Sequence, residues 1–380
     1  MQVAWFTDTW LPNRDGVVNS LLTFKNELEK RGHLVHLFVP GEKDIEEDNI
    51  YTYKSKPFKR YPNYRIPSFL SLFSSRTAKI IREIEPDIIH SHSPGIIGIH
   101  AVIASFKYSI PLIFTYHTFI EDSIYFVSDS ILFQQISKKL LSVWLRWYLR
   151  RCSAFIVPSK AAYEEIKQKL ITKEAHIIPT GINVERFANG NGRIVRKKLR
   201  KEGKIILHVG RIVKEKNLDM LVKVAPILCK SYPDITFLIV GEGPARSYLE
   251  KLIKEKGLEK YFFFTGFVKD EELPNYYASA DVFVFPSTYE TQGIVALEAM
   301  AAGLPVVAAR CRALPDLIED EKNGFLFSPN DAQECAKKIC MAFESEEIKK
   351  EGKRTAEMYS VEKCAEKLLS VYRRVYEDSL

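Results

Sequence analysis

The sequence predicts an α/β fold of two doubly wound, Rossmann-like domains. Short apolar runs alternate with helical segments along the whole chain, and this series restarts near residue 204. Alternation of this kind is typical of parallel sheets that helices cover on both faces. The chain has 380 residues, 46% of them hydrophobic. That length and composition are enough for about two domains with ample cores.

The apolar runs form two sets, one in each half of the chain. The first set comprises residues 2–6, 34–39, 87–90, 112–116, 154–157 and 176–178, and the second comprises 205–209, 236–240, 261–265, 282–285, 305–308 and 325–327. Residues 179–200 between them hold three glycines and several basic residues, a composition typical of an exposed linker. We therefore expect domains at 1–180 and 204–360, a linker at 181–203 and a final helix within 361–380.

The most informative segment is the stretch from Glu290 to Met300. An apolar run that ends at Pro286 precedes it, and Gly303 closes the helix-forming sequence that follows, so a strand, a turn and a helix are expected in order. If the helix begins near Gly293, the first backbone N–H groups point out of its positive end, where they stabilise a phosphate. The residues that would supply these groups are Gly293, Ile294 and Val295.

Two carboxylates flank this helix start. Glu290 would lie in the loop that faces the phosphate, and Glu298 lies five residues inside the helix, roughly 7.5 Å further along at 1.5 Å per residue. Glu298 is then placed to reach a ribose, and Glu290 to reach a sugar on the other side of the phosphate. The alternative is that both glutamates are solvated residues at a helix end.

Cations follow the strand predicted at residues 204–210. Arg211, Lys214 and Lys216 come directly after it, and an open α/β sheet holds anionic ligands at the carboxyl ends of its strands. Arg211 offers a planar fork for two phosphate oxygens, and Lys216 offers a compact charge to the same diphosphate. For Lys214 we prefer the alternative, a surface cation whose stem lies along apolar groups.

Candidate residues also occur in the first domain. Gly16 follows the first strand and lets the backbone approach a phosphate or sugar closely; the alternative is an ordinary helix start that Asp15 caps. His117 stands at the end of an apolar strand, where a ring nitrogen can bond a sugar hydroxyl; a lone histidine is more often structural. Three further histidines are candidates for a supporting role: His90, His92 and His100.

Ordered motifs over most of the chain resemble the retaining glycosyltransferases of family 4, which have the GT-B fold. In the second half these motifs are Gly210-Arg211-x4-Lys216-Asn217, Glu290-x7-Glu298 and residues 303–307. In the first half they are residues 6–12, 15–17, 31–33 and 115–118, followed by 158–159 and 178–182. Matches in this order are more specific than any single motif.

The resemblance implies two domains that face each other across a cleft, with the last helix crossing back onto the first domain. It implies transfer of a hexose from a nucleoside diphosphate sugar with the anomeric configuration kept, and neither a metal nor a cofactor is expected. The catalytic centre would contain His117, Arg211, Lys216 and Glu290; the donor would be bound by Gly16, Arg211, Lys216, Glu290, Gly293, Ile294, Val295 and Glu298. Family members usually have a small and an apolar residue where this chain has Thr291 and Gln292, so the hexose, expected to be glucose, stays open.

Two basic segments bear on the acceptor. Residues 54–82 carry eight Lys or Arg and no Asp or Glu, and residues 130–163 carry six, again without an acid, among aromatic and aliphatic side chains. Cations beside apolar groups suit a helix that lies on an anionic bilayer, although a solvated basic face would look alike. The candidates for membrane contact are Lys138, Lys139, Trp144, Arg146, Trp147, Arg150 and Arg151.

Short motifs favour a lipid acceptor such as diacylglycerol. Residues 9–12 and the pattern His117-Thr118-x2-Glu121-Asp122 resemble the branch of the family that glucosylates this lipid. A soluble or polysaccharide acceptor, a nucleotide-sugar epimerase of the same fold and a non-catalytic sensor are the alternatives. Nucleic acid is not an expected partner, because no recognised binding motif accompanies the net charge of +7.

Composition limits the remaining classes. The six cysteines form no Cys-x-x-Cys pair, so neither a disulfide framework nor a zinc site is implied. No signal-peptide pattern and no apolar run near the roughly 20 residues of a membrane span appear. We therefore expect a cytoplasmic protein, in peripheral contact with the inner face of the membrane if the basic segments bind lipid.

Overall fold

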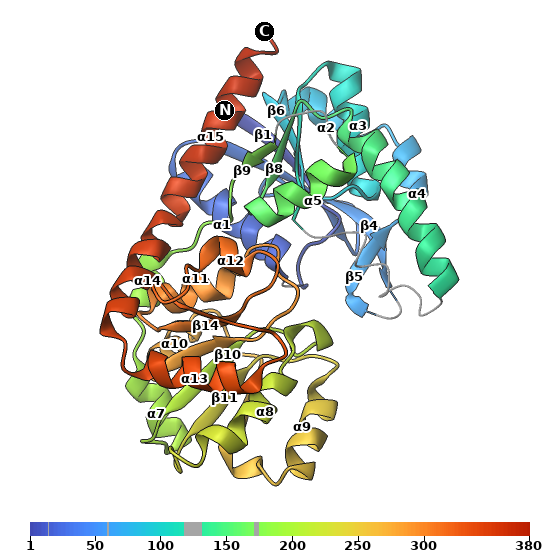
Figure 1. The fold of residues 1–380 in the computed structure, drawn as a ribbon. Helices are drawn as coiled ribbons and strands as arrows, with labels where there is room; N and C mark the ends of the chain where they lie inside the picture. Colours follow the sequence, from blue (N-terminus) through green and yellow to red (C-terminus); the bar gives the residue numbers. More distant parts are fainter. Residues whose placement is uncertain (14, 59–60, 118–130, 171–174) are drawn as a thin grey trace. The chain divides into compact units, whose positions relative to one another are not determined.

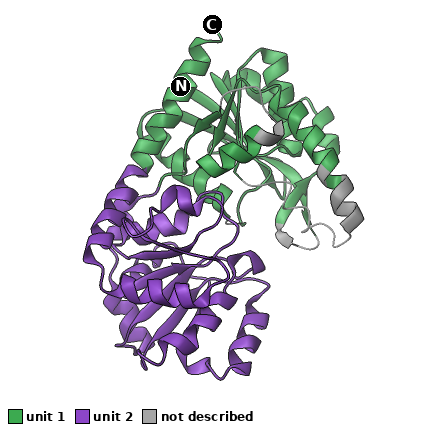
Figure 2. Cartoon of the chain, viewed as in Figure 1, with its two compact units in different colours: residues 1–181, 361–380 green, residues 182–360 purple. Residues whose placement is uncertain are grey.

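The computed structural model describes residues 1–13, 15–58, 61–117, 131–170 and 175–380. The chain divides into two compact units (Figure 2). Unit 1 comprises Met1–Gly181 and Val361–Leu380, and unit 2 comprises Ile182–Ser360. Each unit is a mainly parallel sheet with helices on both faces (Figure 1), which confirms the predicted fold class.

The sheet of unit 1 has the strand order β3-β4-β2-β1-β6-β7-β8-β9, with β5 paired to β4. Its parallel strands lie within two residues of the predicted runs: β1 (Gln2–Phe6), β2 (Leu34–Gly41), β6 (Ile88–Ser91), β7 (Leu112–Thr115), β8 (Ala154–Val157) and β9 (Ala175–Ile177). β6, β7 and β8 are fully buried, so they are continuous apolar runs in the sequence, whereas β9 at the edge of the sheet is only partly buried.

Three strands at one edge of this sheet were not predicted. β4 (Ile50–Phe58) runs parallel to β2, and β3 (Ile45–Glu47) and β5 (Tyr61–Pro67) run antiparallel to β4. β4 alternates lysines with buried side chains and contains a proline, and β3 is fully exposed. Polar, lysine-rich sequence is common on edge strands, and a search for apolar runs does not detect it.

The helices of unit 1 are α1 (Gly16–Lys30), α2 (Arg76–Ile84), α3 (Ile96–Tyr108), α4 (Ile131–Leu149), α5 (Lys160–Leu170) and α15 (Val361–Glu377), with the short 3-10 helix η1 (Phe69–Phe73). The C-terminal helix α15 packs beside α1 on one face of the sheet (Figure 1). Its Tyr372 hydroxyl accepts a hydrogen bond of 3.0 Å from the buried Trp5 indole. The last segment of the chain therefore completes the core of the first unit.

The sheet of unit 2 is parallel throughout, in the order β12-β11-β10-β13-β14-β15. Its strands are β10 (Ile205–Val209), β11 (Thr236–Val240), β12 (Phe262–Gly266), β13 (Val282–Phe285), β14 (Val306–Ala309) and β15 (Phe325–Phe327). Because β10 pairs with both β11 and β13, the chain direction across the sheet reverses at β10. The loops after β10 and β13 leave the sheet at this switch point, where open α/β sheets bind ligands.

Helices cover the two faces of this sheet and bury separate apolar cores. They are α6 (Val184–Ala188), α7 (Gly192–Leu199), α8 (Asp219–Leu228), α9 (Arg246–Glu255), α10 (Leu273–Ser279), α11 (Ile294–Ala301), α12 (Leu314–Leu317), α13 (Ala332–Phe343) and α14 (Glu346–Met358), with the 3-10 helices η3 (Lys214–Lys216) and η4 (Glu259–Tyr261).

The prediction of an exposed linker at residues 181–203 is wrong. Residues 182–203 belong to unit 2 and include α6 and α7, whose Phe187 and Val195 are buried in the core. A Cβ at Gly192 would lie only 2.1 Å from the Ala278 carbonyl oxygen of α10. The glycine there reflects close packing of two backbones rather than flexibility.

Candidate active site

In unit 2 the loops after β10 and β13 are tied together. The Thr288 amide donates a hydrogen bond of 2.9 Å to the Glu215 carbonyl oxygen, and the Ser287 hydroxyl donates one of 3.3 Å to the same oxygen. These bonds place the cationic loop of β10 beside the segment that leads from β13 into α11. The two motifs found in the sequence thus meet at one place in the sheet.

The Lys216 ammonium pairs with the Glu290 carboxylate across these loops. Both side chains are mostly buried, with 20% of Lys216 and 13% of Glu290 exposed, and the ammonium lies 5.4 Å from the ring centroid of Phe285. An ammonium has three donors, so Lys216 can bind a second anion while it keeps Glu290. The structure therefore brings together two of the residues predicted for the catalytic centre.

Arg211 is exposed, and its guanidinium has no partner among the residues that the structure describes. It follows Gly210, whose φ of +150° favours glycine. The loop after β11 packs directly on this turn, because a Cβ at Gly241 would lie 2.0 Å from the Gly210 carbonyl oxygen. Sequence reasoning missed Gly241, although a glycine directly after a predicted strand could have signalled a close backbone approach.

Helix α11 begins where it was predicted. Gly293 is its N-cap, with φ +90°, and Ile294 is its first residue. Within the described chain, the amides of Gly293, Ile294 and Val295 donate no hydrogen bond. These N–H groups at the positive end of the helix are therefore available to an anion.

Glu298 lies one turn into α11 and is partly buried. The Tyr277 hydroxyl, on α10, donates a hydrogen bond of 2.7 Å to its carboxylate. Burial raises the pKa of Glu298 to about 7, and the bond from Tyr277 opposes this shift. Tyr277 was not predicted, because a tyrosine inside a helix belongs to no recognised motif. Its hydrogen bond orients the Glu298 carboxylate, which the sequence analysis assigned to the ribose.

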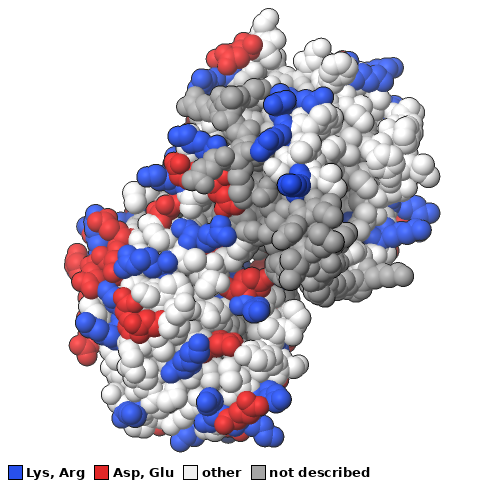
Figure 3. All heavy atoms as spheres, turned by 45° about the vertical axis from the view of Figure 1, so that its right-hand side comes forward, with Lys and Arg blue, Asp and Glu red and all other residues white. Residues whose placement is uncertain are grey.

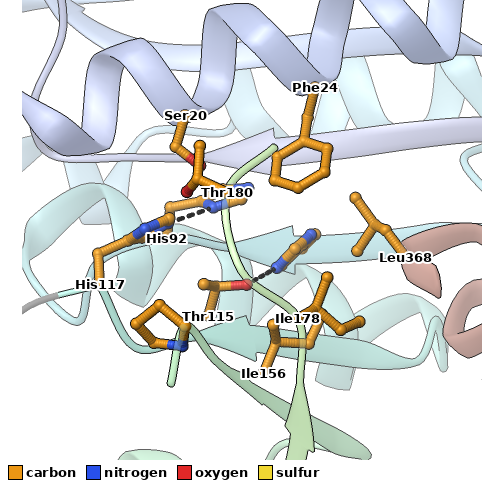
Figure 4. A pocket seen from close by; sticks show the side chains of 11 residues that line it. Ser20, Phe24, His92, Thr115, His117, Ile156, Ile178, Thr180 and Leu368 are labelled. Atoms are coloured by element: carbon orange, nitrogen blue, oxygen red, sulfur yellow. Dashed lines mark hydrogen bonds between the residues drawn. The ribbon is translucent and has the colours of Figure 1, made fainter. Parts of the chain in front are cut away.

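A small pocket in unit 1 contains the predicted His117 (Figure 4). His117 Nε2 lies 3.0 Å from His92 Nδ1, and the His92 ring lies 4.0 Å from that of His90. The other residues that line the pocket are Ser20, Phe24, Thr115, Ile156, Pro158, Ile178, Thr180 and Leu368. Burial lowers the pKa of His117 to about 4, and nearby Asp15 opposes the shift. The imidazole is thus neutral at physiological pH.

His90 and His92 join this cluster, but His100 does not. Burial and the neighbouring histidines hold the pKa of His90 and of His92 well below the usual range. His100 lies on α3, between the hydroxyls of Ser71 and Thr77 at 3.0 and 2.9 Å, so its role is structural. The supporting role suggested for His100 is therefore not supported by its position.

The start of α1 is capped within the chain. The Asp15 carboxylate accepts hydrogen bonds of 2.9 Å from the amides of Val17 and Val18. A Cβ at Gly16 would meet nothing within 4 Å, so there is open space for a ligand beside this glycine. The capping alternative for Asp15 is confirmed, and donor binding by Gly16 stays a prediction.

The described basic side chains of α4 and of the turn directly after it are exposed. Lys139, Arg146 and Arg150 are exposed, and Leu140 and Val143 beside them are 66% and 65% exposed. In the view of Figure 3, unit 1 presents mainly uncharged and basic groups.

The aromatic and remaining basic candidates on α4 contact one another. Trp147 stacks on Trp144 at 4.8 Å and lies under the Arg151 guanidinium at 3.9 Å. Trp144 itself is partly buried and donates a hydrogen bond to the Pro94 carbonyl oxygen. The Lys138 side chain and residues 121–122 lie outside the described residues.

The described residues offer neither a metal cluster nor a membrane-spanning helix. They contain no group of three or more His, Cys, Asp or Glu side chains arranged to hold a metal ion. None of the helices in the described part of the chain combines the length and the apolar character that crossing a membrane requires.

Family models match both units. Residues 14–186 match the model "Glycosyltransferase Family 4", and residues 193–358 match "Glycosyl transferases group 1". An alpha-monoglucosyldiacylglycerol synthase from Acholeplasma laidlawii is 33% identical over 341 residues, which cover 87% of this chain and 86% of that protein. A synthase of the same name from Streptococcus pneumoniae is 32% identical over 338 residues, covering 86% of this chain and 75% of the relative.

Solved structures share the fold. Anabaena HepE in complex with UDP superposes with a TM-score of 0.78 at 21% identity, covering 98% of this chain and all of the other. Together, the two sheets, the site at the switch point and the relatives define a GT-B glycosyltransferase. The chain belongs to glycosyltransferase family 4, and its relatives place it in the lipid glycosyltransferase branch.

The raised pKa of Glu298 predicts how pH affects stability. Between pH 4.5 and about 7 the folded protein binds a proton that the unfolded chain has lost, so this residue lowers the free energy of unfolding as pH rises. Glu298→Gln removes the effect. We expect the variant to gain about 1–3 kcal/mol relative to the parent between pH 5 and pH 8, measured by thermal unfolding. The exposed Glu357→Gln is the control, and equal pH profiles for parent and Glu298→Gln would contradict the prediction.

Proposed function

We propose that this glycosyltransferase moves a hexose, glucose in the first instance, from a nucleoside diphosphate sugar to a hydroxyl of a membrane lipid such as diacylglycerol. It keeps the anomeric configuration and uses no metal ion. The observation that carries the proposal is the cluster at the switch point of unit 2: Lys216 paired with Glu290, the unpartnered Arg211 and the free amides at the start of α11. The two synthases named above, which are named for a glucosylated diacylglycerol, support the acceptor.

The diphosphate binds to the positive groups of this cluster. Arg211 donates two parallel hydrogen bonds to phosphate oxygens, Lys216 supplies a point charge, and the α11 amides add further donors. Negative charge grows on the β-phosphate as the glycosidic bond lengthens, so these groups stabilise the transition state more than the ground state. These groups stabilise the negative charge that a divalent cation stabilises in other enzymes that act on phosphates.

The carboxylates recognise the two sugars of the donor. Glu298, oriented by Tyr277, accepts hydrogen bonds from the ribose hydroxyls. Glu290, held by Lys216, accepts from hydroxyls of the hexose. Because Lys216 contacts both Glu290 and the phosphate, it holds the hexose at a fixed position relative to the leaving phosphate.

Retention follows from attack on the face that the phosphate leaves. The bond between the anomeric carbon and the β-phosphate oxygen breaks, the acceptor oxygen forms a new bond to that carbon, and the acceptor proton passes to the departing phosphate oxygen. Glu290 forms an ion pair with Lys216, so we do not assign it as a nucleophile of the kind that retaining hydrolases use.

The exposed face of α4 brings the protein to its acceptor. Lys139, Arg146 and Arg150 supply charge for anionic headgroups, and Leu140 and Val143 supply apolar surface beside them. Each cation near an anionic bilayer contributes about 1 kcal/mol, so several together hold the protein reversibly.

The function is tested by a panel of nucleoside diphosphate sugars offered with diacylglycerol vesicles, with a soluble glycan, or alone. We expect a lipid product one hexose heavier, with the donor's anomeric configuration, whether or not a chelator is present; mass spectrometry and NMR identify it. If product forms only with the glycan, the acceptor is a soluble glycan and not a lipid. Conversion of donor alone to an isomeric sugar nucleotide would instead indicate an epimerase.

Lys216→Met and Arg211→Ala test the phosphate site. We expect kcat to fall about 100- to 1,000-fold in each, because a donor that acts on the charge of the transition state is lost. Thermal unfolding checks that the variants stay folded. Lys214→Met is the matched control, since this cation is exposed in the same loop. Near-normal turnover in both site variants would refute the phosphate assignment.

Membrane contact is tested with a triple variant, Lys139→Gln, Arg146→Gln and Arg150→Gln. We expect sedimentation with vesicles that contain phosphatidylglycerol to weaken about 10- to 100-fold, and the parent to bind phosphatidylcholine vesicles poorly. The control changes three exposed cations of unit 2: Arg193, Lys197 and Lys198. If both triple variants lose the same affinity, net charge rather than α4 determines binding.

A further inference from the structure

The close contact between the His92 and His117 rings limits which of their nitrogens can carry a proton. His117 Nε2 and His92 Nδ1 lie 3.0 Å apart with their rings stacked at 5.3 Å. Burial keeps both imidazoles neutral, so each ring carries one N–H. A hydrogen bond forms only if one of the two facing nitrogens carries its proton and the other does not.

The remaining nitrogen of His92 indicates which ring donates. His92 Nε2 is buried inside the pocket and has no hydrogen-bond partner, and the residue is only 7% exposed. If His117 donated, His92 would carry its proton on Nε2 and bury an unsatisfied N–H. If His92 donates from Nδ1, Nε2 is left as a bare acceptor, and no buried donor is orphaned.

The neighbouring ring is held in a defined tautomer by the C-terminal helix. The Tyr372 hydroxyl accepts from the Trp5 indole at 3.0 Å, and within the described chain His90 Nδ1, 2.5 Å away, is the acceptor available to the hydroxyl proton, so Tyr372 donates to His90. His90 then carries its proton on Nε2 and donates it to the Thr115 hydroxyl at 2.7 Å. His92 packs against His90 and against the Trp5 ring, whose centroid is 5.0 Å away, so its orientation is set by groups that are themselves locked.

We propose that His92 is a positioning residue that donates its Nδ1 proton to His117 and so fixes His117 with its proton on Nδ1. His117 Nδ1 has no hydrogen-bond partner within the described chain, and His117 is only partly buried, so this N–H is available to a ligand. His117 then presents an N–H donor to an oxygen atom of a bound ligand and does not act as a base from Nδ1. The inference rests on the proposed function and specifies the proton position of His117, which the sequence predicts for the catalytic centre.

The tautomer can be measured directly on the full chain. Nitrogen-15 NMR of histidine-labelled protein at pH 7 distinguishes protonated from bare ring nitrogens, and the His117→Gln variant assigns the His117 signals. We expect His117 to carry its proton on Nδ1 and His92 on Nδ1. A proton on His117 Nε2 would overturn the proposal, and so would a positively charged ring.

Substitutions of His92 test the functional consequence. In asparagine the amide nitrogen occupies the place of Nδ1, whereas in glutamine it lies near the place of Nε2. We expect His92→Ala and His92→Gln to lower kcat/KM about 10- to 100-fold, and His92→Asn to stay within about threefold of the parent. The dissociation constant of the nucleoside diphosphate, whose site lies in unit 2, should change less than twofold.

The outcomes separate this inference from the proposed function. Equal losses for the asparagine and glutamine variants would show a merely structural role for His92 and overturn the inference, and unchanged activity in His92→Ala would do the same. If the parent turns over no donor with any acceptor, the proposed function fails; the NMR result then still decides whether His92 donates to His117.

Discussion

The Lys216–Glu290 pair is the interaction on which the candidate site of unit 2 depends. Taking a single charge out of water costs several kcal/mol, and a mostly buried ammonium is retained only with a partner. The pair therefore forces the loops after β10 and β13 to stay together, and the backbone bonds from Thr288 and Ser287 to Glu215 do the same. The cationic loop after β10 and the segment that leads into α11 are thus held together before any ligand arrives, which is the preorganisation that the proposed electrostatic catalysis needs.

Unit 1 has the same kind of sheet, but its candidate site is built from neutral rather than charged side chains. Its buried histidines are neutral, because burial disfavours the charged ring and the Asp15 carboxylate opposes this effect only in part at His117. Directional hydrogen bonds therefore replace charge, and they run from the C-terminal helix through Tyr372 and His90 to Thr115. The same class of fold thus presents charged side chains at the strand ends of one unit and neutral hydrogen-bonding side chains at the strand ends of the other.

The parallel strands that helices cover on both faces were predictable from the sequence. β10 and β13 read directly as apolar runs, because parallel strands are covered on both faces. β3 to β5 did not, since an edge strand needs only one apolar side and is protected by charge. The segment of α6 and α7 was misread because its glycines suggested flexibility, whereas Gly192 is required by the close approach of α10.

By itself, the sequence determined the two-domain α/β class, the start of α11 at Gly293, and the residue types that we propose to bind a diphosphate and two sugars, because these depend on local patterns and on motifs with fixed spacing. Only the tertiary structure decided which of these residues touch. The pairing of Lys216 with Glu290, the bond from Tyr277 to Glu298 and the contact of His92 with His117 each join different elements of the sheet layers. Such contacts depend on strand order and on the exclusion of water, which no local pattern encodes.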